Sequence, residues 1–116
     1  MSEPARPIAR IWRGRTPASK ASAYLDFLET KGLSGYRATP GNRGVQVLLR
    51  TENDVAEFLL ITWWDGYDAI RRFAGPDPER AVYYPEDDDF LLEKEPEVTH
   101  ASVLRADFPQ QLTIDN

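Results

Sequence analysis

The chain has 116 residues, 41% of them hydrophobic and 28% charged, which is typical of one globular domain. The absence of cysteine excludes disulfide bonds, a thiolate nucleophile and zinc–sulfur sites, and the net charge of −5 disfavours nucleic acid as a partner. No apolar run is long enough to span a membrane, and the first ten residues lack the apolar segment of a secretory signal, so we expect a cytoplasmic protein without a membrane partner.

The first predicted strand covers residues 7–14, where apolar and polar residues alternate. Thr16 and Pro17 then suit the N-cap and the first position of a helix. Gly32 is expected to end this helix, because glycine is common just after a helix C-terminus. Its apolar stripe consists of Ala18, Ala21, Leu25 and Leu28.

A hairpin is predicted in the middle of the chain. Residues 34–44 are rich in glycine, and Pro40-Gly41 suits a type II turn. Strands are expected over 45–50 and 55–64. The four polar residues 51–54 between them indicate an antiparallel pair.

A second helix follows the hairpin. Asp65 is placed to cap it, and Gly75 with Pro76 is expected to end it. Its inward stripe comprises Tyr67, Ile70, Phe73 and Ala74. The remaining predicted elements are short helical stretches over 78–83 and 86–92 and a last strand over 97–104.

The predicted order is β-α-β-β-α-β, which is the ferredoxin-like α+β plan. We expect an antiparallel four-stranded sheet with both helices on one face. Residues 1–104 would form this domain, and residues 105–116 would form a C-terminal tail.

Two adjacent tryptophans, Trp63 and Trp64, end the third predicted strand. Neighbouring residues of a strand point to opposite faces, so only one of them can pack beneath the helices. Strand 55–64 is apolar on both faces, which is typical of a strand buried on both sides. We therefore expect an identical subunit to cover the second face.

An enclosed space between two such sheets is the predicted binding site. On the first strand, Ala9 and Ile11 suit the helix side, so their neighbours would face the enclosed space. On the last strand, Val98, His100 and Ser102 are expected to face this space, and His100 is the only histidine of the chain. The residues expected to line the cavity are Ile8, Arg10, Trp12, Trp64 and His100.

Four stretches carry a family resemblance: IARIWRGR, GYRATPGNRGVQVLLR, WWDGYDAIRRFAGPDPERAVYYPEDDDFLL and EPEVTH. Together they cover about residues 8–100, and the chain resembles the antibiotic biosynthesis monooxygenase family, whose fold is a dimeric α/β barrel. The similarity is strongest to a branch whose last strand usually reads His-Tyr-Glu-Val. Here that stretch is His100-Ala101-Ser102-Val103, so roles of the Tyr and Glu do not carry over.

The resemblance implies a homodimer with a pocket between sheet and helices in each protomer. It also implies an oxidoreductase that oxygenates a small aromatic phenol, a quinone precursor, without a metal, flavin or other cofactor. In such chemistry the deprotonated substrate itself reduces O₂, while the protein supplies an apolar slot, a base and an oxyanion partner.

A haem-degrading branch of the same family uses an Asn on the first strand, a Trp at the end of the third and a His after the second helix. Trp64 matches the Trp position, but Arg10 stands on a first strand without Asn, and no histidine lies between Gly75 and Leu92. The haem-degrading triad is therefore absent. A non-catalytic dimer that binds haem or another small ligand stays open as an alternative, as does a dimer whose cavity is filled by side chains.

The predicted catalytic residues are His100 and Arg10. His100 suits a general base, because the unperturbed pKa of histidine is about 6.5; its alternative is a buried histidine tied into strand packing. Arg10 suits a phenolate or enolate partner; its alternative is an ion pair across the dimer interface. Trp12 and Trp64 suit stacking on a flat ligand, or they belong to the dimer core.

Tyrosines complete the predicted substrate site. Tyr36 and Tyr83 are expected to donate hydrogen bonds to a substrate oxygen, with Tyr84 as a further candidate; packing with the hydroxyl at the surface is the alternative. The acidic run 86–89 is interpreted as a favourable charge at a helix start rather than as a metal site.

Overall fold

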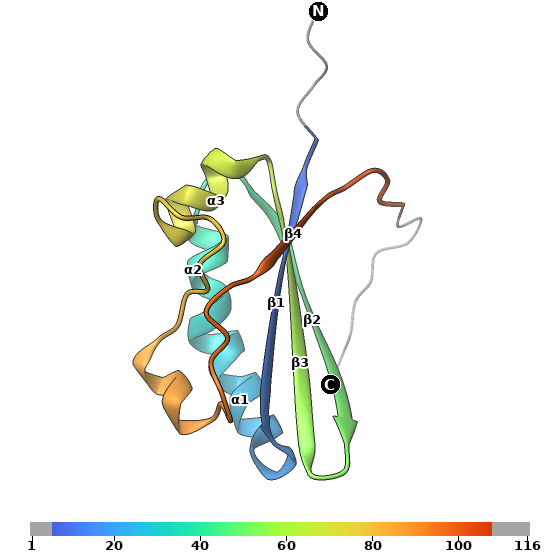
Figure 1. Cartoon of the computed structure of the whole chain (residues 1–116), viewed down its shortest axis with the longest axis vertical. Helices are drawn as coiled ribbons and strands as arrows, with labels where there is room; N and C mark the ends of the chain where they lie inside the picture. The colour runs from blue at the N-terminus through green and yellow to red at the C-terminus, as the bar shows by residue number, and fades with distance from the viewer. Residues whose placement is uncertain (1–5, 108–116) are drawn as a thin grey trace, which may run out of the picture.

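The computed structural model describes residues 6–107. An antiparallel sheet forms one layer, and the helices cover one of its faces (Figure 1). The sheet order is β2-β3-β1-β4, with the first and third strands at the centre, so the predicted ferredoxin-like fold is confirmed. The strands are β1 (Ile8–Pro17), β2 (Asn42–Glu52), β3 (Val55–Trp64) and β4 (Thr99–Ser102).

The first helical region continues beyond the predicted stop at Gly32. After the 3₁₀ turn η1 (Ala18–Lys20) it comprises α1 (Ala21–Phe27), a π-helical turn η2 (Leu28–Gly32) and α2 (Leu33–Ala38). Gly32 has helical angles, and a Cβ on it would lie 3.1 Å from the Leu28 side chain. This glycine therefore permits close packing inside the helix rather than ending it, and the expected loop over 34–44 shrinks to the turn around Gly41, where φ is 93°.

The predicted cap at Thr16 and Pro17 is wrong, since both residues belong to β1. The predicted four-residue loop 51–54 is also wrong. Strands β2 and β3 run up to a two-residue turn, in which Asn53 takes a positive φ of 56°. Asn tolerates this left-handed conformation better than most residues, so the hairpin is tighter than its polar sequence indicated.

Helix α3 (Tyr67–Ala74) lies where the sequence predicted it and ends at Gly75, whose φ is 95°. Its N-cap is Gly66, so the predicted cap at Asp65 is wrong. Beyond it, the predicted helix over 78–83 does not form. That segment instead makes a bridge to the segment before β4, in which Ala81 N–H donates to Pro96 O at 2.9 Å and Val98 N–H to Glu79 O at 2.8 Å. The helical stretch predicted over 86–92 is reduced to the 3₁₀ turn η3 (Pro85–Asp89).

The assignment of strand faces is a second correction. Residues at even positions of β1 and β3 are buried beneath the helices, and those at odd positions occupy the other face. Ala9 and Ile11 therefore lie on the open face. Opposite to the expectation, the helix side holds Ile8, Arg10, Trp12 and Trp64. Arg10 is paired in register with His100, so these two residues share one face.

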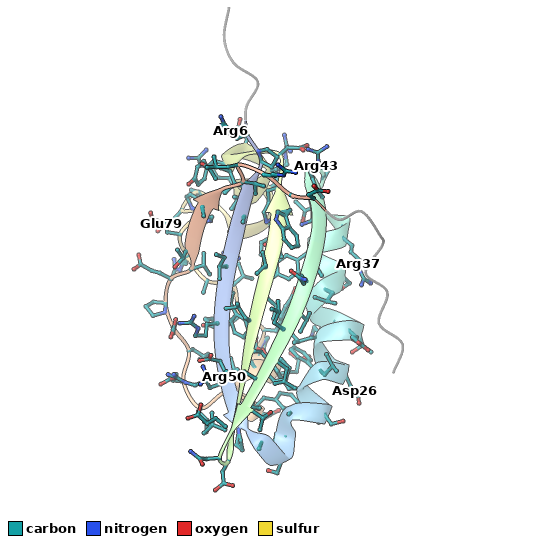
Figure 2. All side chains as sticks on the ribbon, turned by 90° about the vertical axis from the view of Figure 1, so that its right-hand side faces the viewer. Arg6, Asp26, Arg37, Arg43, Arg50 and Glu79 are labelled. Carbon is teal, nitrogen blue, oxygen red and sulfur yellow. The ribbon has the colours of Figure 1, made fainter. Side chains whose placement is uncertain are left out.

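The core lies between the sheet and the helical layer. Its fully buried side chains include Trp64, Tyr24, Phe58 and Ile70. The opposite face is viewed in Figure 2, and no helix of residues 6–107 covers it. Its central strands carry half-buried apolar residues: Ile11, Leu59, Ile61 and Trp63. No helix in the described part of the chain is long and apolar enough to cross a membrane.

Candidate functional site

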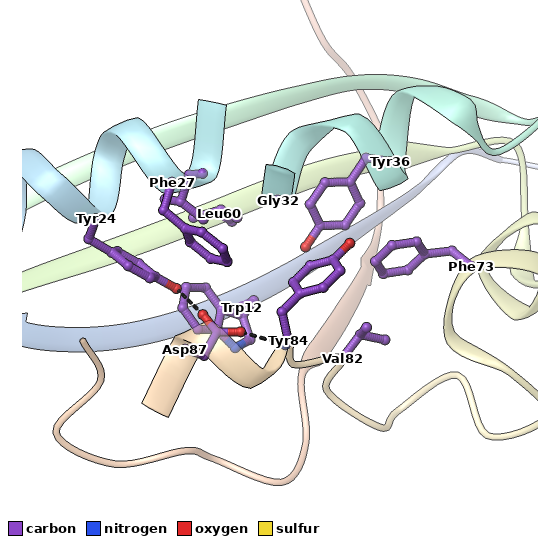
Figure 3. A pocket seen from close by; sticks show the side chains of 11 residues that line it. Trp12, Tyr24, Phe27, Gly32, Tyr36, Leu60, Phe73, Val82, Tyr84 and Asp87 are labelled. Atoms are coloured by element: carbon purple, nitrogen blue, oxygen red, sulfur yellow. Dashed lines mark hydrogen bonds between the residues drawn. The ribbon is translucent and has the colours of Figure 1, made fainter. Parts of the chain in front are cut away.

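An aromatic pocket lies between the sheet, the long helical region and η3 (Figure 3). The room inside it is only about 20 Å³, enough for roughly one water molecule. The Tyr84 ring fills its centre, with a hydroxyl that makes no hydrogen bond among residues 6–107. The ring is half-buried and packs edge-on against Phe27, so a ligand larger than a water molecule would have to displace it. The walls include Trp12, Tyr24, Phe27, Tyr36, Phe73 and Asp87.

Two of the predicted site residues line this pocket, and a third adjoins it. Trp12 forms part of its sheet floor, and Tyr36 closes one end from α2. Tyr83 is not in the wall, but its hydroxyl accepts a hydrogen bond from Trp12 Nε1 at 3.2 Å and donates one to Glu95 O at 2.6 Å. Tyr83 therefore holds the Trp12 ring in place from outside the pocket.

Trp64 supports the pocket from behind. It is fully buried, and its Nε1 donates to Thr62 Oγ1 at 2.8 Å. Its ring packs against Tyr36 and Phe73, with ring centroids 6.3 and 5.7 Å away. Tyr36 and Phe73 lie closer still to each other, at 4.5 Å. Trp64 thus positions two wall residues without reaching the interior itself.

Arg10 is a buried cation without a carboxylate partner. It is 2% exposed and forms no ion pair among residues 6–107. Its Nη2 donates a hydrogen bond to Arg80 O at 2.6 Å, and its guanidinium carbon lies 5.5 Å from the centroid of the Phe73 ring. Its Nε has no hydrogen-bond partner among residues 6–107. Burial lowers the pKa of Arg10. Its position beneath the helices also excludes the interface ion pair considered from the sequence.

His100 lies beside Arg10 on the sheet edge. Its ring contacts Tyr67 at a centroid distance of 5.4 Å, and its buried Nε2 has no hydrogen-bond partner. Burial, with a contribution from the Arg10 charge, lowers the pKa of His100 below its ordinary value. Both effects favour the neutral imidazole and make His100 a weaker proton acceptor than a free histidine. Neither His100 nor Arg10 belongs to the pocket wall, and Phe73 stands between Arg10 and the pocket.

Sequence reasoning missed a buried carboxylate in the wall, Asp87. Its side chain is 4% exposed and accepts hydrogen bonds from Tyr24 Oη at 2.9 Å and from Tyr84 N–H at 2.7 Å. Desolvation raises the pKa of Asp87 above its ordinary value. One signal in the sequence was available. Asp87 is the third residue of a turn that begins at Pro85, and an acidic side chain at that position often accepts a hydrogen bond from the backbone just before the turn.

The buried tyrosines predict a loss of stability at alkaline pH. Burial raises the pKa of Tyr36 to about 12 and that of Tyr24 further. Unfolded tyrosine ionises near pH 10, so the folded state holds these protons more tightly. The stability that these raised pKa values add to the folded state is complete below about pH 10. The Tyr36 part is lost as the pH rises from 10 toward 12, by about 1.4 kcal/mol for each unit of pKa difference between the folded and unfolded states. Urea unfolding at stepped pH should show this decline, and Tyr36→Phe should reduce it; an unchanged slope in the variant would contradict the assignment.

No group of His, Asp and Glu residues that could hold a metal ion occurs within residues 6–107. No family model matches the chain, and no curated protein matches it. The sheet order and the single helical layer instead define its class, a ferredoxin-like α+β protein, and solved structures of this class match it over nearly the whole chain.

One similar structure is a protein of unknown function from Nitrosomonas europaea, with a TM-score of 0.66, 16% identity, and coverage of 94% of this chain and 100% of the other. A second is the monooxygenase ActVA-Orf6 of Streptomyces coelicolor in complex with nanaomycin D, with a TM-score of 0.56, 13% identity and coverage of 91% and 94%. A third is SnoaB of Streptomyces nogalater, a cofactor-independent oxygenase, with a TM-score of 0.53, 16% identity and coverage of 91% and 100%. The resemblance to antibiotic biosynthesis monooxygenases is therefore confirmed at the level of the fold.

Proposed function

We propose that the protein is a cofactor-independent oxygenase acting on a small polycyclic phenol bound in the aromatic pocket of each protomer. The observation that carries this proposal is Arg10, a buried guanidinium with no carboxylate beside it. A buried cation without a counterion is costly, and an anionic ligand would relieve that cost. The aromatic walls suit a flat ring, and ActVA-Orf6, a structure with the same fold, binds nanaomycin D.

In the proposed reaction, His100 removes the phenolic proton and Arg10 pairs with the resulting oxyanion. The electron-rich anion then reduces O₂. Anthrone is the keto form of such a phenol, and it reacts with O₂ to give anthraquinone and water. One atom of O₂ enters the anthraquinone and the other enters the water. His100 and Arg10 both lie outside the pocket wall, and Phe73 separates the pocket from Arg10. The Phe73 side chain must therefore rotate for the substrate oxygen to reach these two residues.

A homodimer is part of the proposal. The face of the sheet opposite the helices carries Ile11, Leu59, Ile61 and Trp63, which are half-buried, and Leu48, which is 40% exposed. An apolar sheet face of this kind is stabilised by a second copy of the same surface. The pocket lies on the other side, so each protomer would hold a complete site.

His100→Ala tests the proposed base. We expect the enzyme-dependent rate of oxygen uptake with anthrone to fall about 100-fold, because general-base catalysis contributes roughly that much. Thr99→Ala, at the exposed neighbouring position on the same strand, is the matched control and should keep the rate. Sedimentation should show the same assembly for both variants. A His100→Ala protein as active as the wild type would remove His100 from the mechanism.

The alternative is a non-catalytic dimer of the same fold, which either binds a small ligand such as haem or fills its cavity with side chains. The room of about 20 Å³ around Tyr84 favours the version whose cavity is filled by side chains. The two functions differ in one measurement. The oxygenase consumes O₂ in proportion to protein concentration when anthrone is added, whereas the alternative leaves only the uncatalysed rate.

A further inference from the structure

Asp87 is the only carboxylate in the wall of the aromatic pocket. It projects from η3 toward Tyr24, at the end of the pocket opposite Tyr36 and Phe73 (Figure 3). Each of its oxygens accepts one hydrogen bond, from Tyr24 Oη and from Tyr84 N–H. A carboxylate offers about four acceptor positions, so Asp87 retains acceptor capacity beyond these two bonds.

No cation neutralises Asp87 among residues 6–107. Its acidic neighbours take the nearby lysines instead: Lys31 pairs with Glu86, and Lys94 with Asp88 at 2.5 Å. Asp87 is thus a desolvated acceptor held between an aromatic hydroxyl and a backbone amide. A hydrogen-bond donor on a ligand would replace a hydrogen bond that the carboxylate accepted from water before it was buried.

We propose that Asp87 binds a hydroxyl group of the aromatic ligand, accepting its hydrogen bond, and that Tyr24 is the positioning residue that orients the carboxylate. This inference rests on the proposed function for the phenolic nature of the ligand. Arg10, stacked on Phe73, lies toward the far end of the pocket. The ligand class is therefore a flat aromatic with oxygen substituents at both ends, one bound by Asp87 and the other ionised near Arg10.

The test compares two ligands, 2-naphthol and naphthalene, which differ only in the hydroxyl group. Their binding to the full chain is followed by quenching of tryptophan fluorescence, since Trp12 lines the pocket. In Asp87→Asn we expect the affinity for 2-naphthol to fall about tenfold or more, as for a lost hydrogen bond to a charged group, and the affinity for naphthalene to stay within about twofold. Asp88→Asn, at the exposed neighbouring position, should change neither.

Equal losses for both ligands in Asp87→Asn would show a purely structural role and overturn the inference, as would an unchanged affinity for 2-naphthol. If Asp87→Asn does not fold, Tyr24→Phe decides: it keeps the ring and the carboxylate but removes the orienting hydroxyl. We then expect about a threefold or larger loss for 2-naphthol alone. Equal behaviour of the two ligands in Tyr24→Phe contradicts the proposal.

Oxygen uptake with anthrone separates this inference from the proposed function. A hydroxyl-dependent loss in Asp87→Asn, together with no protein-dependent oxygen uptake by the wild type, supports the Asp87 site and rejects the oxygenase. If the wild type takes up oxygen with anthrone, but Asp87→Asn changes the affinities for 2-naphthol and naphthalene equally, the oxygenase is supported and the Asp87 site is rejected.

Discussion

Arg10→Met is expected to leave the protein folded and slightly more stable while lowering oxygen uptake with anthrone about 1000-fold. The loss follows because removing one donor to a developing oxyanion costs about 100- to 1000-fold in other enzymes, and Arg10 is a buried cation without a carboxylate partner among residues 6–107. The gain follows because methionine fills much of the same space without a desolvated charge. Replacing buried charges by apolar residues is often stabilising, here by about 1 kcal/mol after the bond to Arg80 O is lost.

Urea unfolding and oxygen uptake measure the two halves of this prediction. Arg13→Met is the matched control: Arg13 is on the same strand but on the open face, in an exposed pair with Glu57 at 3.8 Å. Such pairs contribute little, so the control should change the stability by less than about 1 kcal/mol and keep the activity. A loss of about 3 kcal/mol in Arg10→Met would identify a structural cation instead, and full activity would remove it from the site.

Most of the fold was predictable because its elements follow strong periodic patterns. The alternation in β1, the hairpin of β2 and β3 and the stripe through Leu25 and Leu28 indicated the types of element and their order along the chain, and that order predicted the ferredoxin-like fold. Gly32 misled because a glycine inside a helix and one after its end look alike in sequence. What distinguishes them here is the Leu28 side chain packed against the Gly32 backbone, a tertiary contact.

The faces of the sheet were not predictable from polarity alone. Ala9 and Ile11 were placed beneath the helices because they are apolar, and Arg10 was placed on the open side because it alternates with them. The structure reverses this arrangement. Both faces of the central strands carry apolar residues, so the apolar character of Ala9 and Ile11 could not decide between the faces. A rule of polarity fails where a site buries a charge for chemistry, as we propose for Arg10.

The pocket wall depended on segments without a sequence period. Asp87 and Tyr84 belong to the irregular connection after α3, where prolines interrupt any helical pattern and loop contacts set the path. Their acidic and aromatic neighbours in the sequence look equivalent to them. Only the burial of Asp87 against Tyr24 separates it from the exposed Asp88 and Asp89.

The adjacent tryptophans offer a test of the whole arrangement, because substitution of each should weaken a different interface. Trp64→Ala is expected to lower the free energy of unfolding by about 3–5 kcal/mol, as for other fully buried large aromatics. It removes the ring that supports Tyr36 and Phe73 and leaves a cavity between β3 and the helices. For a domain whose total stability is about 5–15 kcal/mol, this variant should be the most damaging of those considered.

Trp63→Ala removes the same side chain from the other face, where the ring is half-buried and lines a surface pocket with Val45 and Val103. We expect a smaller loss in protomer stability and a rise of about tenfold or more in the dimer dissociation constant, since aromatic anchors dominate interfaces. Urea unfolding and sedimentation at a series of concentrations separate the two effects. If Trp63→Ala leaves association unchanged, the open face is not the proposed dimer surface, because its largest apolar side chain contributes nothing to pairing. If Trp63→Ala destabilises the protomer as much as Trp64→Ala does, Trp63 belongs to the core of the protomer and not to a dimer surface.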